Sequence, residues 1–286
     1  MNLHRLRDGK VVALLLVMAL AVVVLLNQFA PTRSGFSAQI ANSANSAGTA
    51  ASNTCTGQVG FDAAAAKALF AYKFTETTGS TVAADFSGKA ANGTYQGPMV
   101  ASTPSPIACP RDPGTSWLLN GSSNFVSTPA LQQNPTTFSE EVWFRTTVAG
   151  GLLIGFGGSQ VSVSGQHDRQ VYLNTSGQLV FGTYNNGTQV VTSPKAYNDG
   201  TWHHVVATMS AATGMALYVD GAVVASNAKY TVPEPGNGYW RIGYDTVSGW
   251  PGSGSNYYFT GSMRFAAVYG SVLTATQVSS HYAAGR

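Results

Sequence analysis

Charged side chains are scarce in this sequence. Only 9% of its 286 residues are Asp, Glu, Lys or Arg, and the formal net charge is +3. The first ten residues contribute +2 of that charge, because they hold three basic side chains and one acidic side chain. The rest of the chain therefore has no basic stripe of the kind that binds nucleic acid. Low charge combined with 32 glycines is typical of an exported all-β protein, and it argues against a nucleic-acid partner.

Acidic residues are also too few and too scattered to suggest catalysis. The chain has 12 of them and no Glu-x-Asp-x-Glu run, which would place several carboxylates on one face of a strand. Glu140 and Glu141 are adjacent, so on a strand they point to opposite faces. Neither Gly-x-Ser-x-Gly nor His-Glu-x-x-His occurs. The sequence predicts that the protein is not an enzyme, and hydrolysis of glycosides is the least favoured function.

Cysteine is limited to Cys55 and Cys109. In an exported chain an even pair favours a disulfide bond, and two buried free thiols are the alternative. Neither cysteine has a second Cys or a His at the spacing of a metal site, so a thiolate-bound metal is not expected.

The N-terminal part predicts export. Residues 1–10 are basic and are expected in the cytoplasm, and an unbroken apolar run covers 11–26. We interpret 11–30 as one hydrophobic helix, either an uncleaved transmembrane anchor or a cleaved signal peptide. Residues 31–54 form a linker rich in Ser, Ala and Asn. Residues 55–286 would then lie outside the cell, attached to the membrane or secreted.

The exported part shows the pattern of an all-β domain. Short alternating runs at 170–174, 178–184 and 188–192 are separated by turn residues, as in a meander. Asp220-Gly221 between two β-rich runs predicts a tight hairpin. Helical periodicity is confined to 62–72 and 274–284. Frequent short strands predict a sandwich or a jelly roll.

Two adjacent histidines in the run WHHVVATM, residues 202–209, resemble catalytic or metal-binding residues at first sight. On a strand, His204 shares a face with Trp202, whereas His203 points the other way. The two imidazoles therefore cannot hold one metal ion from a regular strand. We interpret both as structural histidines, because a catalytic histidine needs a positioned partner.

Five segments, in order, resemble one known family. They are AADFSGKAANGTYQG at 83–97, LLNGSSNFVSTP at 118–129, FSEEVWFRTT at 138–147, GTWHHVVATMSAATGMALYVDGAVVA at 200–225, and the stretch 258–285. Together they are similar to the laminin G-like jelly-roll domains of the concanavalin A-like lectin/glucanase superfamily. The resemblance implies two antiparallel sheets packed face to face, in agreement with the strand pattern.

The resemblance also implies a calcium site in the loop 85–94. Asp85 would supply a carboxylate, and Asn92 and Thr94 would supply further oxygen ligands. Many relatives carry an Asp-Glu pair where this chain has Arg264 and Phe265, so one acidic ligand is missing. Two alternatives stay open: the Asp85 side chain closes an Asx-type turn, or Arg264 pairs with Asp85 in place of the ion.

The remaining candidates are aromatic and polar loop residues. Trp250 lies in a Gly/Ser-rich loop and is expected to be exposed, and Tyr184 and Asn186 lie near another hairpin tip. His167 and Asp168 belong to a polar segment that either lines a surface site or forms a solvated turn. Aromatic rings with amide and hydroxyl groups suit a carbohydrate site.

These features predict a non-catalytic binding module, at the cell surface or secreted, that recognises carbohydrate. The alternative is a module for protein–protein adhesion or for the structure of the cell envelope. Its partners would be a glycan or an extracellular protein, and the membrane through the N-terminal helix.

Overall fold

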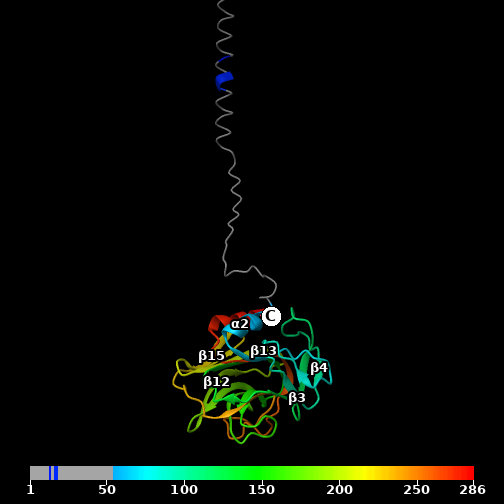
Figure 1. The fold of residues 1–286 in the computed structure, drawn as a ribbon, viewed down its shortest axis with the longest axis vertical. Coiled ribbons are helices and arrows are strands. Elements are labelled where there is room, and N and C mark those ends of the chain that lie inside the picture. Colours follow the sequence, from blue (N-terminus) through cyan, green and yellow to red (C-terminus); the bar gives the residue numbers. More distant parts are fainter. Residues whose placement is uncertain (1–12, 14–15, 19–53) are drawn as a thin grey trace, which may run out of the picture. The chain divides into compact units, whose positions relative to one another are not determined.

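The computed structural model describes residues 13, 16–18 and 54–286. From residue 54 onward, two antiparallel sheets pack face to face, and helices α2 (Cys55–Ala65) and α3 (Ala275–Ala284) lie together at one side of the domain (Figure 1). The strands are β1 (Ala68–Tyr72), β2 (Val82–Ala83), β3 (Gly93–Gln96), β4 (Val100–Ser102), β5 (Ser116–Asn120), β6 (Phe125–Ser127), β7 (Gln132–Gln133), β8 (Phe138–Arg145), β9 (Leu152–Gly157), β10 (His167–Leu173), β11 (Gln178–Tyr184), β12 (Thr188–Ala196), β13 (Trp202–Ser210), β14 (Gly214–Val219), β15 (Ala222–Asn227), β16 (Asn237–Ile242) and β17 (Thr260–Tyr269).

The strand order confirms the predicted all-β sandwich. The first sheet has the order β15-β14-β13-β8-β17-β5-β4, with β1 beside β17. The second has the order β12-β11-β10-β9-β16-β6-β3-β2, with β7 beside β16. Neighbours in a sheet come from distant parts of the sequence, as in a jelly roll, and all the pairings are antiparallel.

The N-terminal predictions fall mostly outside the described residues. Residues 13 and 16–18 are helical, but the rest of the predicted anchor or signal peptide at 11–30 and the linker up to 53 are not described. Within the part of the chain that the structure describes, no helix is both long and apolar enough to cross a bilayer.

The two helices differ in how well the sequence predicted them. The helix expected at 274–284 is present as α3, where Thr274 and Gln277 form a capping box. The helix expected at 62–72 is wrong: α2 ends at Ala65, and 68–72 is strand β1. The cause is tertiary, because β1 is needed to pair with β17 along Ala68–Tyr72.

The disulfide between Cys55 and Cys109 is confirmed. Their Cα atoms lie 5.8 Å apart, and the bond joins the first residue of α2 to a loop 54 positions further along. Asp112 of that loop accepts a hydrogen bond from the Cys55 N–H at 2.7 Å. The loop therefore holds the start of α2 both covalently and by occupying one of its unpaired N–H groups.

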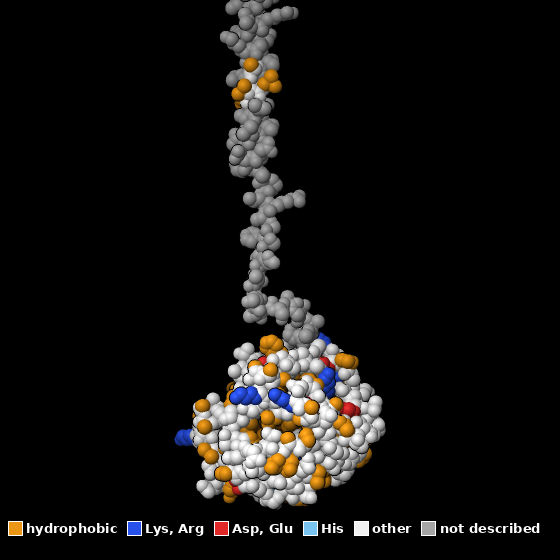
Figure 2. Space-filling model, in the orientation of Figure 1, with side chains coloured by type: hydrophobic (Ala, Val, Ile, Leu, Met, Phe, Trp, Pro, Cys, Tyr) orange, Lys and Arg blue, Asp and Glu red, His pale blue; other side chains and the backbone are white. Residues whose placement is uncertain are grey.

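Alternation along the strands separates a continuous apolar core from the outer faces. On β13, Val205, Ala207 and Met209 face the core between the sheets, whereas Val206 packs beneath α2 and α3. Figure 2 shows few charged side chains on the visible face of this domain, as the composition predicts. The hairpin at Asp220-Gly221 is also confirmed, with φ values of 54° and 81°.

The two adjacent histidines lie on opposite faces of β13, as predicted. Nδ1 of His203 lies 2.8 Å from the Asp220 carboxylate, and its Nε2 lies 3.1 Å from Asp199. Nε2 of His204 lies 2.8 Å from Oε1 of Glu141. Both rings are buried and held by carboxylates on neighbouring segments.

Glu141 is the centre of a buried polar network beneath the helices. Besides His204, its carboxylate contacts Nδ1 of His281 at 2.9 Å and accepts a hydrogen bond from the Tyr269 hydroxyl at 2.8 Å. The other nitrogen of His281, Nε2, lies 2.9 Å from Asp62 of α2. Burial alone would lower the pKa of His281, but the charges and hydrogen bonds of Glu141 and Asp62 outweigh it and raise that pKa to about 10. The network joins α2, α3 and the first sheet.

The raised pKa of His281 predicts a loss of stability in mild alkali. Its pKa rises from an ordinary 6.5 to about 10 in the folded protein, so its contribution is complete below pH 6.5 and disappears as the pH approaches 10. We expect urea unfolding at pH 9.5 to give a lower free energy of unfolding than at pH 6.5. The variant His281→Gln should show a smaller difference between the two pH values. If the stability of the wild-type protein and of His281→Gln depended equally on pH, the raised pKa of His281 would be contradicted.

Candidate functional site

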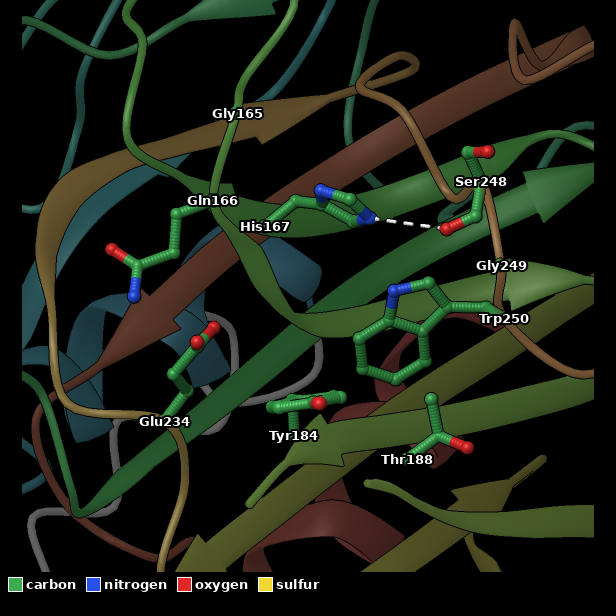
Figure 3. A pocket seen from close by; sticks show the side chains of 9 residues that line it. All are labelled: Gly165, Gln166, His167, Tyr184, Thr188, Glu234, Ser248, Gly249 and Trp250. Atoms are coloured by element: carbon green, nitrogen blue, oxygen red, sulfur yellow. Dashed lines mark hydrogen bonds between the residues drawn. The ribbon is translucent and has the colours of Figure 1, made fainter. Parts of the chain in front are cut away.

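A surface pocket of about 400 Å³ lies on the outer face of the second sheet. It is formed by the start of β10, the end of β11, the start of β12 and three loops, and Figure 3 shows its side chains. We call it the Trp250 pocket, and it is lined by Gly165, Gln166, His167, Tyr184, Thr188, Glu234, Ser248, Gly249 and Trp250. The pocket brings together three of the sequence candidates, Trp250, Tyr184 and His167.

Trp250 is a wall of this pocket, but the expectation that it is exposed is wrong. Only 5% of its surface is accessible, because its ring packs into an apolar cluster with Tyr172 and Val180. The ring fits there because residue 182 is a glycine: a Cβ at Gly182 would lie 2.2 Å from Cζ3 of Trp250. The Tyr172 hydroxyl also donates to the carbonyl of Pro251 at 2.6 Å and so fixes the loop.

Polar groups and a second ring complete the pocket. Tyr184 is 40% exposed at the end of β11. The His167 ring lies 6.4 Å from the Trp250 ring, and its Nε2 is 3.4 Å from the carbonyl oxygen of Ser248. The Glu234 carboxylate points toward Gln166 and His167 across the pocket (Figure 3). The pocket therefore offers an exposed phenol ring, an amide, an imidazole and a carboxylate.

Asp168 positions three of these wall segments from behind. Its carboxylate accepts hydrogen bonds from the backbone N–H groups of Arg169, Tyr184 and Glu234, at 2.6 to 2.8 Å. The Arg169 guanidinium donates to it at 3.1 Å. Burial nevertheless raises the pKa of Asp168, more than Arg169 and the backbone donors lower it. The solvated turn considered for Asp168 is wrong, since this residue is buried.

Asn186 is not part of the pocket. It lies exposed in the turn between β11 and β12 with φ of 53°, a left-handed conformation that asparagine tolerates. Sequence reasoning missed Glu234, Gln166 and Thr188. The run Pro-Glu-Pro at 233–235 was a usable signal for Glu234, because an isolated acid between prolines belongs to a rigid loop. Gln166 and Thr188 have no comparable signal.

The loop around Asp85 does not fit a calcium ion. The Asp85 carboxylate accepts hydrogen bonds from the backbone N–H groups of Ala71, Ser87 and Ala91 and from the Ser87 hydroxyl, at 2.8 to 3.0 Å. Oδ1 of Asn92 accepts from the Asp85 N–H. These donors occupy the lone pairs that calcium would need, and they hold the pKa of Asp85 below its usual value against the effect of burial. The arrangement is a loop closed by its own aspartate.

Arg264 does not pair with Asp85 either, so that alternative is wrong. Its guanidinium is buried and donates to the carbonyl oxygens of Ala108, Cys109, Asp112 and Pro113. Thr94, the third expected ligand, has an exposed side chain on β3. Arg264 therefore anchors the disulfide loop beneath the first sheet and has no part in a metal site.

The fold and the pocket define a class: an all-β jelly-roll sandwich with an aromatic pocket on one outer face. The profile of the concanavalin A-like lectin/glucanases superfamily matches residues 120–279, and this chain belongs to that superfamily. The match covers more than half of the sequence. A comparison with curated proteins gives no match.

Solved structures with the same fold include toxin binding domains and an enzyme. The binding domain of Paraclostridial Mosquitocidal Protein 1 superposes with a TM-score of 0.53 at 13% identity, over 75% of this chain and 51% of that one. The binding domain of Botulinum Neurotoxin DC in complex with SialylT gives 0.52 at 13% identity, over 75% and 50%. Trypanosoma rangeli sialidase in complex with DANA gives 0.50 at 13% identity, over 74% and 32%. At such identities the likeness shows the fold alone, and this chain spans about half of the toxin domains.

Proposed function

We propose that this protein is a non-catalytic binding module that recognises carbohydrate through the Trp250 pocket. The observation that carries the proposal is the combination of an exposed Tyr184 ring with polar side chains around an open pocket of about 400 Å³. Pyranose rings present apolar C–H faces that pack on aromatic rings, and their hydroxyls need donors and acceptors at the rim. The superfamily membership and the toxin binding domains of the same fold support this function by analogy.

The pocket keeps hydrogen-bonding groups available for such a ligand. The Glu234 carboxylate and the hydroxyls of Tyr184 and Thr188 are among its lining groups, and none of them has a hydrogen-bond partner within the described residues. Nδ1 of His167 is likewise unpaired there. An unpaired group at a pocket wall gains more from a ligand hydroxyl than one already bonded to the protein.

A binding role without catalysis suits the acids of this pocket. Glycoside hydrolysis uses two carboxyl groups on either side of the scissile bond. Glu234 is the one acidic residue that lines the Trp250 pocket, and the nearby Asp168 is buried against Arg169. Any polysaccharide found to bind should therefore release no new reducing ends on incubation with the protein.

The described features also favour export. A disulfide persists in oxidising compartments, and the Cys55–Cys109 bond fits a domain that lies outside the cytoplasm. We place the domain at the cell surface or in the medium, with the apolar run 11–26 as its anchor or export signal.

The direct test is a glycan array probed with the purified protein, followed by titration of the strongest glycan. We expect Tyr184→Ala to weaken that binding about 10-fold, the loss of about 1.4 kcal/mol for one stacked ring. Phe61→Ala is the matched control, because Phe61 is a 79% exposed aromatic on α2, away from the pocket. Neither change should alter the melting temperature by more than about 2 °C.

Two outcomes would redirect the proposal. If Tyr184→Ala and Phe61→Ala bind the glycan equally well, the Trp250 pocket is not the site. If the folded protein binds nothing on the array, a role in protein–protein adhesion or in the cell envelope replaces carbohydrate recognition. Trp250→Ala is a poor probe, because removing a buried tryptophan costs about 3–5 kcal/mol of stability by itself.

A further inference from the structure

A second pocket, of about 670 Å³, lies on the opposite side of the sandwich, beside the end of α3. We call it the Trp202 pocket, and it is lined by Pro106, Ile107, Ala108, Pro110, Trp143, Thr201, Trp202, His203, Asp220, Tyr282, Gly285 and Arg286. It shares no residue with the Trp250 pocket, and no step of the proposed carbohydrate recognition uses it. Its chemistry differs from that of the first pocket in two respects.

First, its walls are mainly aromatic and aliphatic. Trp143, Trp202 and Tyr282 contribute rings, and the segment 106–110 contributes two prolines and an isoleucine. The rings of Trp143 and Tyr282 are stacked, with centroids 5.8 Å apart and an interplanar angle of 14°. This stack depends on Gly285, where a Cβ would lie 2.0 Å from Cζ2 of Trp143.

Second, its polar side chains are already bonded to the protein. The Trp202 indole N–H donates to the Pro106 carbonyl at 2.9 Å. Asp220 holds Nδ1 of His203 at 2.8 Å and accepts from the His204 N–H at 3.0 Å. A sugar would bring many hydroxyls to a wall with few free partners, and buried unpaired hydroxyls are costly. The pocket therefore suits a ligand that needs no hydrogen bonds.

Charged groups of both signs lie around this pocket. Asp220 and Asp199 both hold His203 and raise its pKa against the effect of burial, yet Asp220 keeps 28% of its side chain accessible at the wall. The protein already places one cation here: the Arg286 guanidinium donates a hydrogen bond to the Tyr282 hydroxyl, lies 5.4 Å from the centroid of that ring and is attracted more weakly by Asp220. A cation over an aromatic face beside a carboxylate is the arrangement that recognises organic cations.

We propose that the Trp202 pocket binds a quaternary ammonium group, with the rings of Trp143, Trp202 and Tyr282 as its walls and Asp220 as its counter-charge. Such a group is positively charged and has no N–H to satisfy, which matches both properties of the pocket. Arg286 competes with it for the Tyr282 ring and for Asp220. Removing the charge of Arg286 is therefore expected to strengthen binding.

The test compares choline with 3,3-dimethyl-1-butanol, in which carbon replaces the charged nitrogen at the same shape. Calorimetric titration of the full-length chain should show choline binding at least about 10-fold tighter than the neutral compound. Trp202→Ala should weaken choline binding about 10-fold, and Trp202→Phe should retain most of it. Arg286→Gln should tighten choline binding about 3-fold, and Tyr184→Ala should leave it unchanged.

Three results would overturn the proposal: equal binding of the two compounds, weaker choline binding in Arg286→Gln, or no choline binding by the folded chain. Because Arg286 is exposed, its variant tests the charge without disturbing the fold.

Vesicles of phosphatidylcholine and of phosphatidylglycerol distinguish the sources of the group. Preference for phosphatidylcholine that is lost in Trp202→Ala assigns a lipid headgroup, and binding of free choline without that preference assigns a soluble ligand. Vesicle binding that Trp202→Ala leaves intact would come from the apolar run at 11–26.

Discussion

Glu141→Gln is expected to lower the free energy of unfolding by about 3–5 kcal/mol, because it breaks a buried ion pair on one side only. The carboxylate of Glu141 faces Nε2 of His204, Nδ1 of His281 and the Tyr269 hydroxyl. Burial alone would raise its pKa, yet the positive charge of His281 and the hydrogen bonds of both histidines hold that pKa far below the usual value. A glutamine at this position would supply one acceptor instead of two and would leave Asp62 as the remaining counter-charge of His281.

The neighbouring residue provides a matched control. Glu140 lies on the same strand with its side chain on the other face, in the core between the sheets, and neither of its oxygens has a hydrogen-bond partner within the described residues. Burial raises the pKa of Glu140 well above its usual value, more than the attraction of Arg169 lowers it, which favours the neutral form of this group. Glu140→Gln therefore keeps the shape of the side chain and breaks no hydrogen bond or ion pair among the described residues. We expect it to change stability by less than about 1 kcal/mol.

Urea unfolding of the two variants at pH 7 measures the contrast, with the same substitution at adjacent positions. Equal losses of unfolding free energy in the two variants would show that β8 is sensitive to any change of its acidic residues. That result would contradict the special role of Glu141 in the buried network. A larger loss for Glu140→Gln would reverse the assignment of which carboxylate is charged.

The histidines show why the sequence predicts faces but not partners. Alternation along WHHVVATM places His203 and His204 on opposite sides, and the structure confirms it. The partner of His204 lies 63 positions earlier in the chain, and the partner of His281 lies 140 positions away. Local spacing carries no information about such pairs, since they are set by which strands become neighbours in the sheet.

The same limit explains the outcome at the Trp250 pocket. Tyr184 ends an alternating run before a turn, so its exposure follows from local sequence. Trp250 follows a glycine in a segment with turn chemistry, and local sequence predicts exposure there too. Its burial depends on Gly182, which lies 68 positions earlier and leaves space for the indole ring on β11. The space at Gly182 accommodates the indole ring only because the loop that carries Trp250 folds over β11. Local sequence does not predict that long-range contact.

The boundaries of α2 depend on long-range contacts as well. Periodicity suggested 62–72, whereas the helix starts at Cys55 after the cap residue Thr54. Asp112 accepts from the N–H of Cys55, and the disulfide ties that residue to Cys109. The start of the helix is thus fixed by a loop more than 50 positions away, which no window of local sequence contains.

Replacing both cysteines by serine should therefore cost about 4 kcal/mol of stability, the chain-entropy value for a closed loop of 54 residues. For a domain of this size the melting temperature should fall by about 8–16 °C. The double variant Cys55→Ser/Cys109→Ser is preferable to a single one, because it leaves no free thiol. Wild-type protein unfolded in the presence of a reductant should show nearly the same loss. A change below about 1 kcal/mol would mean that the hydrogen bonds of Asp112 and Arg264 hold the loop without the covalent bond.

The region of the domain that loses stability in the double variant is as informative as the size of the loss. The disulfide joins the start of α2 to Cys109, and the segment 106–110 around Cys109 is a wall of the Trp202 pocket. The double variant should therefore lose protection against hydrogen exchange in α2 first, while β8 and β13 stay protected until global unfolding.

Choline binding at the Trp202 pocket should weaken in the variant, whereas glycan binding at the Trp250 pocket should remain, because no lining residue of that pocket touches the disulfide loop. Equal weakening at both pockets would mean that the two faces of the sandwich are coupled through the core, and the two binding sites would then have to be treated as one cooperative unit.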